Sequence, residues 1–264
     1  MFKQSFVIVS IVVLSTTSYA QFSNPMSPQA SNQSKAQVEM SEKEKDVLLM
    51  KEDATESAYG LLFNEEDFLS GLTPWSQFDN VIVVNKAANG STAQSLKLYS
   101  HRQLILETKV STGREDVEKV SMLTGFFRKF GKGSTTSHWR HTTRGFYTIK
   151  RIENSEYRSG ESKFKMPYAL FFNSTRGLAI HQVPPDLSSG EKSGENALGT
   201  RASGGCVRIH KNVMPTIHQI VTSAGKGSVP VIDTKTGIQK LDASGQPAYE
   251  NGYRTLVIVQ EIQD

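Results

Sequence analysis

The sequence of 264 residues contains a single cysteine, Cys206, and lacks any apolar run long enough to cross a lipid bilayer. One cysteine excludes an intramolecular disulfide framework and any metal site built from several cysteines. The longest apolar run, Phe6 to Leu14, has about ten residues, whereas a spanning helix needs roughly 20. We therefore expect no disulfide-stabilised scaffold and no transmembrane segment in the chain after residue 20.

The chain also lacks a strong charge of either sign. Its formal net charge is +4, from 30 Lys and Arg against 26 Asp and Glu, and it falls to +3 when Lys3 is removed with residues 1–20. A dedicated nucleic-acid-binding domain carries a concentrated positive charge, so no nucleic-acid partner is expected. The mild basicity is compatible with weak attraction to the anionic polymers of a cell envelope.

Residues 1–20 have the pattern of a cleaved secretory signal peptide. Lys3 precedes the apolar run, and the polar stretch after it ends with small side chains at Ser18 and Ala20, where signal peptidase prefers them. The residue directly after the cleavage site is Gln21 and not a cysteine, which argues against a lipid-anchored protein. The prediction is an exported protein of the periplasm or cell envelope.

The remaining chain divides into an extension and a main domain. Residues 21–37 are polar, contain Pro and Ser and show no periodicity, which is typical of a flexible linker. Residues 38–58 mix charged and apolar side chains in a pattern that predicts a helix. We assign residues 21–78 to the linker and helical extension, and residues 79–264 to the main domain.

The main domain has the two-residue hydrophobic period of β-strands. Its segments are rich in β-branched and aromatic residues and are bounded by Gly, Asn and Ser. The predicted strands lie in 81–84, 95–99, 104–113, 145–152, 168–173, 177–183, 229–233 and 255–261. One substantial helix is predicted to begin at Cys206 and end at Gly225, with a break or kink at Pro215. The fold class is therefore mainly β, with one substantial helix.

Cys206 follows two glycines in the segment RASGGCVRIH, residues 201–210. At a helix start, free N–H groups and the peptide dipole would lower the thiol pKa below its free value of about 8.5. Gly204 and Gly205 allow a tight turn, and the N–H groups of Gly205 and Cys206 could form an oxyanion hole. From the residues alone, Cys206 is either a nucleophile or a small buried apolar residue.

A nucleophilic cysteine requires a base, and the chain has six histidines. His181 ends the apolar strand GLAIH, which would hold its imidazole rigidly at a loop mouth. It is either the base or a structural residue. The other five fall in predicted turns, loops or the helix and are expected at the surface: His101, His138, His141, His210 and His218. His138 and His141 have no third ligand at a suitable spacing, so no metal or other cofactor is predicted.

Four segments together resemble the catalytic domain of exported L,D-transpeptidases, the cysteine enzymes that cross-link peptidoglycan. The resemblance covers roughly residues 79–233 and implies that family's β-sandwich. Its specific part is a strand-ending Ile-His followed downstream by Ser-x-Gly-Cys-Val-Arg. The four segments are STGRE (111–115), TTRGFYTI (142–149), MPYALFFNSTRGLAIH (166–181) and SGGCVR (203–208).

The resemblance also implies roles for the matching residues. Cys206 would be the acylated nucleophile and His181 its base, with the Gln182 carbonyl orienting the imidazole. Arg208 would shape the site, either by contacting a substrate carboxylate or by pairing with an internal one. Ser203 is assigned to the same substrate-binding or orienting group.

The implied reaction is transpeptidation of peptidoglycan tetrapeptide stems. A thioester forms as D-Ala leaves, and an acceptor amine then takes the acyl group, giving a cross-link or an exchanged D-amino acid. Carbapenems are expected to be covalent inhibitors. Two alternatives remain: an L,D-carboxypeptidase or cross-link-cleaving peptidase that uses the same pair, and a non-catalytic wall-binding protein.

The chain departs from the family pattern at three places. Gly204 stands where many relatives carry histidine. Residues 182–202 form a longer connection than is common, and we expect a lid over the site. Residues 114–142 form an insertion whose basic and aromatic side chains could grip glycan or stem peptide, or could pack as a helix.

Overall fold

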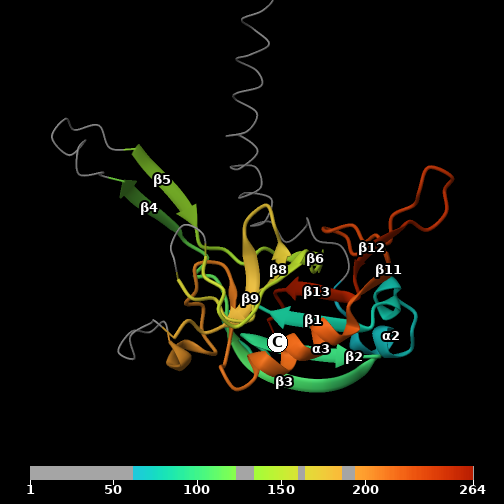
Figure 1. Ribbon diagram of the computed structural model, residues 1–264, viewed down its shortest axis with the longest axis horizontal. Helices are drawn as coiled ribbons and strands as arrows, with labels where there is room; N and C mark the ends of the chain where they lie inside the picture. The colour runs from blue at the N-terminus through green and yellow to red at the C-terminus, as the bar shows by residue number, and fades with distance from the viewer. Residues whose placement is uncertain (1–61, 123–133, 160–163, 186–193, 264) are drawn as a thin grey trace, which may run out of the picture. The chain divides into compact units, whose positions relative to one another are not determined.

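The computed structural model describes residues 62–122, 134–159, 164–185 and 194–263 (Figure 1). The predicted signal peptide, the linker at 21–37 and the predicted helix at 38–58 lie outside the described residues. Within the described ranges, no helix is long and apolar enough to cross a membrane.

The described residues form a mainly β fold, as predicted, built on one curled sheet (Figure 1). The strand order in this sheet is β6-β13-β1-β2-β3-β10-β9-β8-β7. The strands are β1 (Asn80–Asn85), β2 (Ser95–Ser100), β3 (Gln103–Ser111), β6 (Gly145–Thr148), β7 (Arg151–Ile152), β8 (Leu170–Asn173), β9 (Leu178–Gln182), β10 (Val207–Ile209) and β13 (Thr255–Gln260). Two separate antiparallel pairs are β4 (Val117–Met122) with β5 (Ser134–Trp139), and β11 (Lys226–Pro230) with β12 (Tyr249–Tyr253).

The sheet curls because β3 belongs to both of its halves. Most of β3 pairs with β2, whereas its last two residues, Val110 and Ser111, pair with β10. The register between β2 and β3 also shifts at Leu98/Tyr99, which marks a bulge, and bulges bend strands. Figure 1 shows β3 as a long curved strand. The two halves therefore face each other across one core, in the manner of a sandwich.

The core between the halves is filled by aliphatic side chains from both and by α3 (Met214–Ala224). Met214, Ile217 and Val221 lie on one side of α3 at helical spacing and are fully buried. Pro215 lies in the first turn of α3, where the missing N–H costs nothing. Of the break or kink predicted at Pro215, the kink is therefore wrong, whereas a break is present, because the helix begins only at Met214.

The prediction that a helix begins at Cys206 is also wrong. Val207 and Ile209 are fully buried with the half-buried Arg208 between them, which is the alternation of a strand. They form β10, and α3 begins only at Met214. The strand has three residues, too few for its two-residue period to be distinguished from the helical pattern that follows it.

Residues 62–78 contribute to the domain, although the sequence boundary was placed at residue 79. They contain α2 (Glu65–Leu69) and the short helix η2 (Pro74–Gln77), and the short helix η4 (Glu195–Ala197) lies later in the chain. Phe68, Trp75 and Phe78 are buried in a second apolar cluster with Tyr99 and Phe146. The boundary at 79 therefore separates residues that share one core.

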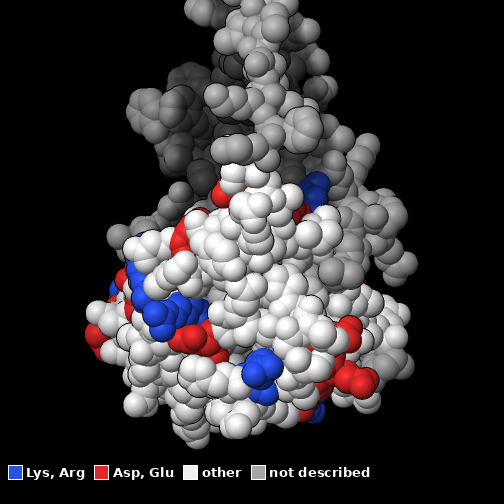
Figure 2. Space-filling view, turned by 90° about the vertical axis from the view of Figure 1, so that its right-hand side faces the viewer, with Lys and Arg blue, Asp and Glu red and all other residues white. Residues whose placement is uncertain are grey.

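Charged side chains on the face shown in Figure 2 lie in small groups of both signs among uncharged residues. Surface ion pairs include Arg254 with Asp79 and Lys150 with Glu250. Each such exposed pair contributes little to stability. Stability depends mainly on the buried apolar clusters.

We predict that Trp75→Phe lowers the free energy of unfolding by about 1–3 kcal/mol, because it leaves the buried Gly237 carbonyl without the indole donor. Trp75 Nε1 donates to that carbonyl at 2.8 Å, and its ring stacks on Phe146 at 5.1 Å. Urea denaturation followed by circular dichroism measures the change. The control Leu72→Ala removes a side chain that is 77% exposed and should change stability by less than about 0.5 kcal/mol. Equal effects of the two substitutions would contradict the docking of residues 62–78.

Candidate active site

The parallel pairing of β9 and β10 places the predicted site residues on one face of the sheet. The register sets Ile180 opposite Val207 and His181 opposite Arg208. Ile180 and Val207 are fully buried in the core between the sheet halves. Because successive side chains of a strand point to opposite faces, His181, Arg208 and, two residues earlier, Cys206 lie on the other face. The structure thus brings together the three residues that carry the predicted chemistry.

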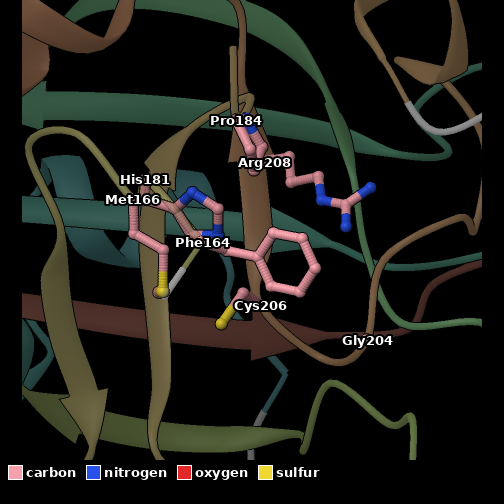
Figure 3. A pocket seen from close by; sticks show the side chains of 7 residues that line it. All are labelled: Phe164, Met166, His181, Pro184, Gly204, Cys206 and Arg208. Atoms are coloured by element: carbon pink, nitrogen blue, oxygen red, sulfur yellow. The ribbon is translucent and has the colours of Figure 1, made fainter. Parts of the chain in front are cut away.

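These residues line a pocket of about 280 Å³. Figure 3 shows His181, from β9, and Cys206, just before β10, with the ring of Phe164 beside them. The pocket is lined by Phe164, Met166, His181, Pro184, Gly204, Cys206 and Arg208. The sequence prediction missed Phe164, Met166 and Pro184, because no periodicity distinguishes a pocket-lining apolar residue from a core residue.

The His181 imidazole is held in one tautomer. Its Nδ1 lies 2.6 Å from the Gln182 carbonyl oxygen, and because that oxygen only accepts, Nδ1 carries the hydrogen and donates it. Nε2 is then the acceptor nitrogen of the ring. The orienting contact expected for Gln182 is present in the structure.

His181 is also uncharged at neutral pH. Burial lowers the pKa of His181 to about 4; the bond to the Gln182 carbonyl opposes this effect, and the positive charge of Arg208 adds to it. Only 3% of the residue is exposed. The imidazole is therefore in the basic form in which it can accept a proton.

Cys206 is partly buried beside this base. Burial raises the pKa of the Cys206 thiol, whereas a hydrogen bond from the Ala179 backbone and the charge of Arg208 act in the opposite direction. The sequence prediction of a lowered pKa is wrong, because it relied on a helix beginning at Cys206. The thiol is therefore the resting form of Cys206.

The two glycines before Cys206 differ in what they require. Gly205 has φ +121°, and a Cβ there would lie 3.0 Å from the His141 carbonyl oxygen and 3.1 Å from Leu178 Cδ2. Only glycine fits this conformation without strain. Gly204 is exposed and has no atom within 4 Å of a Cβ built on it. A Cβ at this position would therefore meet no steric barrier.

Ser203 braces the turn that leads into Cys206. Its fully buried hydroxyl donates to the Cys206 carbonyl at 2.5 Å and accepts from the Gly205 N–H at 3.0 Å. These contacts support the orienting role predicted for Ser203. The Gly205 N–H is engaged in this conformation, so its part in an oxyanion hole stays a prediction that requires the Ser203 bond to open.

Arg208 lines the pocket directly opposite His181 in the register of β9 and β10. Burial lowers the pKa of Arg208, but an arginine starts so high that the guanidinium stays charged. This charge favours the thiolate of Cys206 and disfavours a protonated His181. Contact between Arg208 and a substrate carboxylate stays a prediction.

His141, expected at the surface, is instead buried. Its Nε2 lies 3.2 Å from the Lys86 ammonium, and its Nδ1 contacts a carboxylate oxygen of Glu115. Lys86 and Glu115 also form an ion pair at 3.2 Å. The composition of the segment HWRHT is typical of a polar loop, and nothing in it indicates that His141 is buried. Among the described residues, no group of three or more His, Cys, Asp or Glu could hold a metal ion.

Sequence reasoning also missed Thr142, which contacts the nucleophile turn directly. Its hydroxyl donates to the Gly205 carbonyl at 2.7 Å and accepts from the Gly113 N–H at 2.8 Å. The only signal was its place in the TTRG segment, which gives no hint of a partner 63 residues away.

The insertion at 114–142 forms the strands β4 and β5, paired from Val117↔Trp139 to Met122↔Ser134. His138, predicted in a loop, therefore lies in a strand. Most of the basic and aromatic stretch of the insertion, residues 126–133, lies outside the described residues, and so do residues 186–193 of the predicted lid. That the insertion grips glycan or stem peptide, or packs as a helix, stays a prediction. The lid over the site also stays a prediction.

Comparison with known proteins agrees with this geometry. Residues 79–248 match the family model of the L,D-transpeptidase catalytic domain, named YkuD. The match covers more than half of the chain. The chain belongs to the L,D-transpeptidase catalytic domain family.

Solved structures of the same class are similar to this chain at low sequence identity. An L,D-transpeptidase from Xylanimonas cellulosilytica is 18% identical, with 71% of this chain and 63% of that chain covered and a TM-score of 0.39. One from Mycobacterium tuberculosis is 16% identical, with 70% and 58% covered and a TM-score of 0.38. An L,D-transpeptidase in complex with imipenem is 9% identical, with 69% and 59% covered and a TM-score of 0.33. The chain spans less than two thirds of the length of these three. No curated protein matches it.

We predict that Cys206 reacts with iodoacetamide more slowly at pH 7 than a free cysteine does, because burial raises its pKa. The rate constant should continue to rise above the free-thiol value of about 8.5. Mass spectrometry of the intact protein across a pH series measures the profile. Cys206→Ala, which has no cysteine, is the blank. A plateau reached below pH 8.5 would show that the site lowers the pKa instead.

Proposed function

We propose that the protein is an exported, cysteine-dependent L,D-transpeptidase that acts on peptidoglycan tetrapeptide stems. The observation that carries this proposal is the pairing of Cys206 and His181 in one pocket, with Nδ1 of the imidazole committed to the Gln182 carbonyl. This arrangement leaves Nε2 as the proton acceptor. Family membership supplies the reaction class, and the signal-peptide pattern of residues 1–20 supports action in the periplasm or cell envelope.

The first half-reaction forms the acyl-enzyme. Neutral His181 removes the thiol proton as Sγ of Cys206 attacks the carbonyl carbon of the L-centred residue, and the carbonyl oxygen becomes an oxyanion. Backbone N–H groups of the turn that ends at Cys206 stabilise this charge. When the tetrahedral intermediate collapses, the imidazolium gives its proton to the departing D-Ala amine. A thioester on Cys206 and a neutral imidazole remain.

The second half-reaction transfers the acyl group. An acceptor amine attacks the thioester while His181 removes its proton, and the same proton then returns to the Cys206 sulfur. The product is a cross-link when the amine belongs to a second stem, and an exchanged stem when it belongs to a free D-amino acid. Water in place of the amine gives the hydrolytic alternatives.

Burial adapts the pair to this proton transfer. It lowers the pKa of His181 to about 4 and raises the pKa of Cys206, so both residues rest uncharged. Proton transfer is then coupled to attack, and the Arg208 charge stabilises the sulfur as it becomes negative. A non-catalytic wall-binding protein would have no need for this arrangement.

We predict that His181→Ala lowers turnover of a tetrapeptide stem by at least about 10²-fold, because the general base is lost. His210, 35% exposed and paired with Glu195, is the matched control, and His210→Ala should keep wild-type turnover. Circular dichroism verifies the fold of both. If His210→Ala were as inactive as His181→Ala, the assignment of His181 as the base would be contradicted.

The pH profile of kcat/KM provides an independent prediction. Because the pKa of His181 is lowered to about 4, the base stays neutral in mildly acidic solution, and activity should fall only below about pH 5. An ordinary histidine near 6.5 would give an acid limb more than one unit higher. An acid limb at pH 6.5 would contradict the buried, neutral His181.

The fate of the acyl-enzyme decides between transfer and hydrolysis. We predict that the protein lacking residues 1–20, incubated with purified disaccharide-tetrapeptide, gives cross-linked dimer, or exchanged stems when a D-amino acid is added. Mass spectrometry identifies the products, and Cys206→Ala is the blank. Tripeptide alone at high acceptor concentration would indicate an L,D-carboxypeptidase, and cleavage of a pre-formed dimer a cross-link-cleaving peptidase. No product from folded, reduced protein would favour the wall-binding alternative.

A further inference from the structure

A side chain outside the catalytic pair controls the peptide bond between Gly205 and Cys206. The Thr142 hydroxyl, fully buried, donates to the Gly205 carbonyl oxygen at 2.7 Å. The same hydroxyl accepts from the Gly113 N–H at 2.8 Å. With its donor and acceptor functions both used, the hydroxyl cannot turn without breaking a buried bond.

This contact fixes the direction of the Cys206 N–H. The described peptide bonds are all trans, and in a planar trans peptide the C=O and the next N–H point in opposite directions. The Gly205 carbonyl is directed to buried Thr142, so the Cys206 N–H is directed away from Thr142. A Cβ at position 205 would lie 3.0 Å from the His141 carbonyl oxygen, so the His141 backbone also lies close to this peptide.

A buried cluster of charges holds Thr142 in turn. The Thr142 N–H donates to Glu115 Oε1 at 3.3 Å, and Glu115 Oε2 lies 3.2 Å from Lys86 Nζ and also contacts His141. Lys86 is only 1% exposed, and its ammonium lies 3.7 Å from Glu261. Removing one partner from such a cluster leaves a buried charge uncompensated, so its geometry is strongly constrained. The proposed mechanism uses none of these charges directly.

We propose that Thr142 is a positioning residue that aims the Cys206 N–H at the oxyanion of the acylation step, and that the Lys86–Glu115–His141 cluster holds Thr142 in place. This inference rests on the proposed function, because it concerns the oxyanion of that reaction. Thr142 touches neither substrate nor the reacting sulfur, and it acts through the Gly205–Cys206 peptide.

The test compares Thr142→Val, which keeps the shape and removes the hydroxyl, with Thr142→Ser, which keeps the hydroxyl. Two reactions of Cys206 are followed by mass spectrometry at one pH. Acylation by imipenem passes through an oxyanion, whereas alkylation by iodoacetamide displaces iodide and forms none. Thr142→Val should lower the acylation rate constant by about 10²-fold, the effect of losing one oxyanion donor, and leave alkylation unchanged. Thr142→Ser should restore acylation.

The outcomes separate the inference from the proposed function. Wild-type protein that is alkylated but never acylated would contradict the proposed function, and the inference with it. Wild-type and Thr142→Val proteins acylated at the same rate would overturn the positioning role alone. Parallel loss of alkylation and acylation in Thr142→Val would also overturn it, since the hydroxyl would then support the thiol rather than the N–H.

A second measurement uses wild-type protein and needs no folded valine variant. Because Cys206 is the sole cysteine, labelling with ¹⁵N-cysteine reports one backbone amide. Acylation by imipenem should move the Cys206 amide proton downfield, since it then donates to the thioester oxygen. Thr142→Ser should show the same shift. An amide resonance that does not move on acylation would overturn the proposal.

Discussion

The parallel pairing of β9 with β10 is the interaction on which the site depends. It places His181 opposite Arg208 and sends Ile180 and Val207 into the core on the other face. A slip of one residue in this register would exchange the two faces and bury the catalytic side chains among aliphatic ones. The burial of Ile180, Val207 and Ile209 therefore fixes the geometry of the reaction as well as the stability of the domain.

The environment of Cys206 and His181 disfavours a resting thiolate–imidazolium pair. Burial lowers the pKa of one member and raises that of the other. The only charged side chain lining the described pocket is Arg208, among apolar neighbours such as Met166 and Pro184. A thiol that is not ionised at rest is less readily oxidised than a thiolate.

The sequence predicted the mainly β class and most of the strand segments, because these depend on local alternation, and a short specific motif singled out Cys206 and His181, which the structure places in one pocket. It failed where structure depends on distant contacts. Cys206 precedes a three-residue strand rather than a helix, and that segment is extended because it pairs with β9 and β3, which are distant in the chain. His141 and Thr142 were missed for the same reason: their partners Lys86 and Gly205 are far away in the chain. The identity of one residue in a polar loop does not predict which distant residue it will contact.

The two glycines before Cys206 differ in whether they can accept a side chain. Gly205 is locked by its backbone conformation and by two close neighbours, so substitutions there damage the turn. Gly204 lines the same pocket, yet a side chain built on it has open space in front of it. A Cβ at position 204 meets no steric conflict, so a small substitution there can change the rim of the pocket while the turn before Cys206 keeps its conformation.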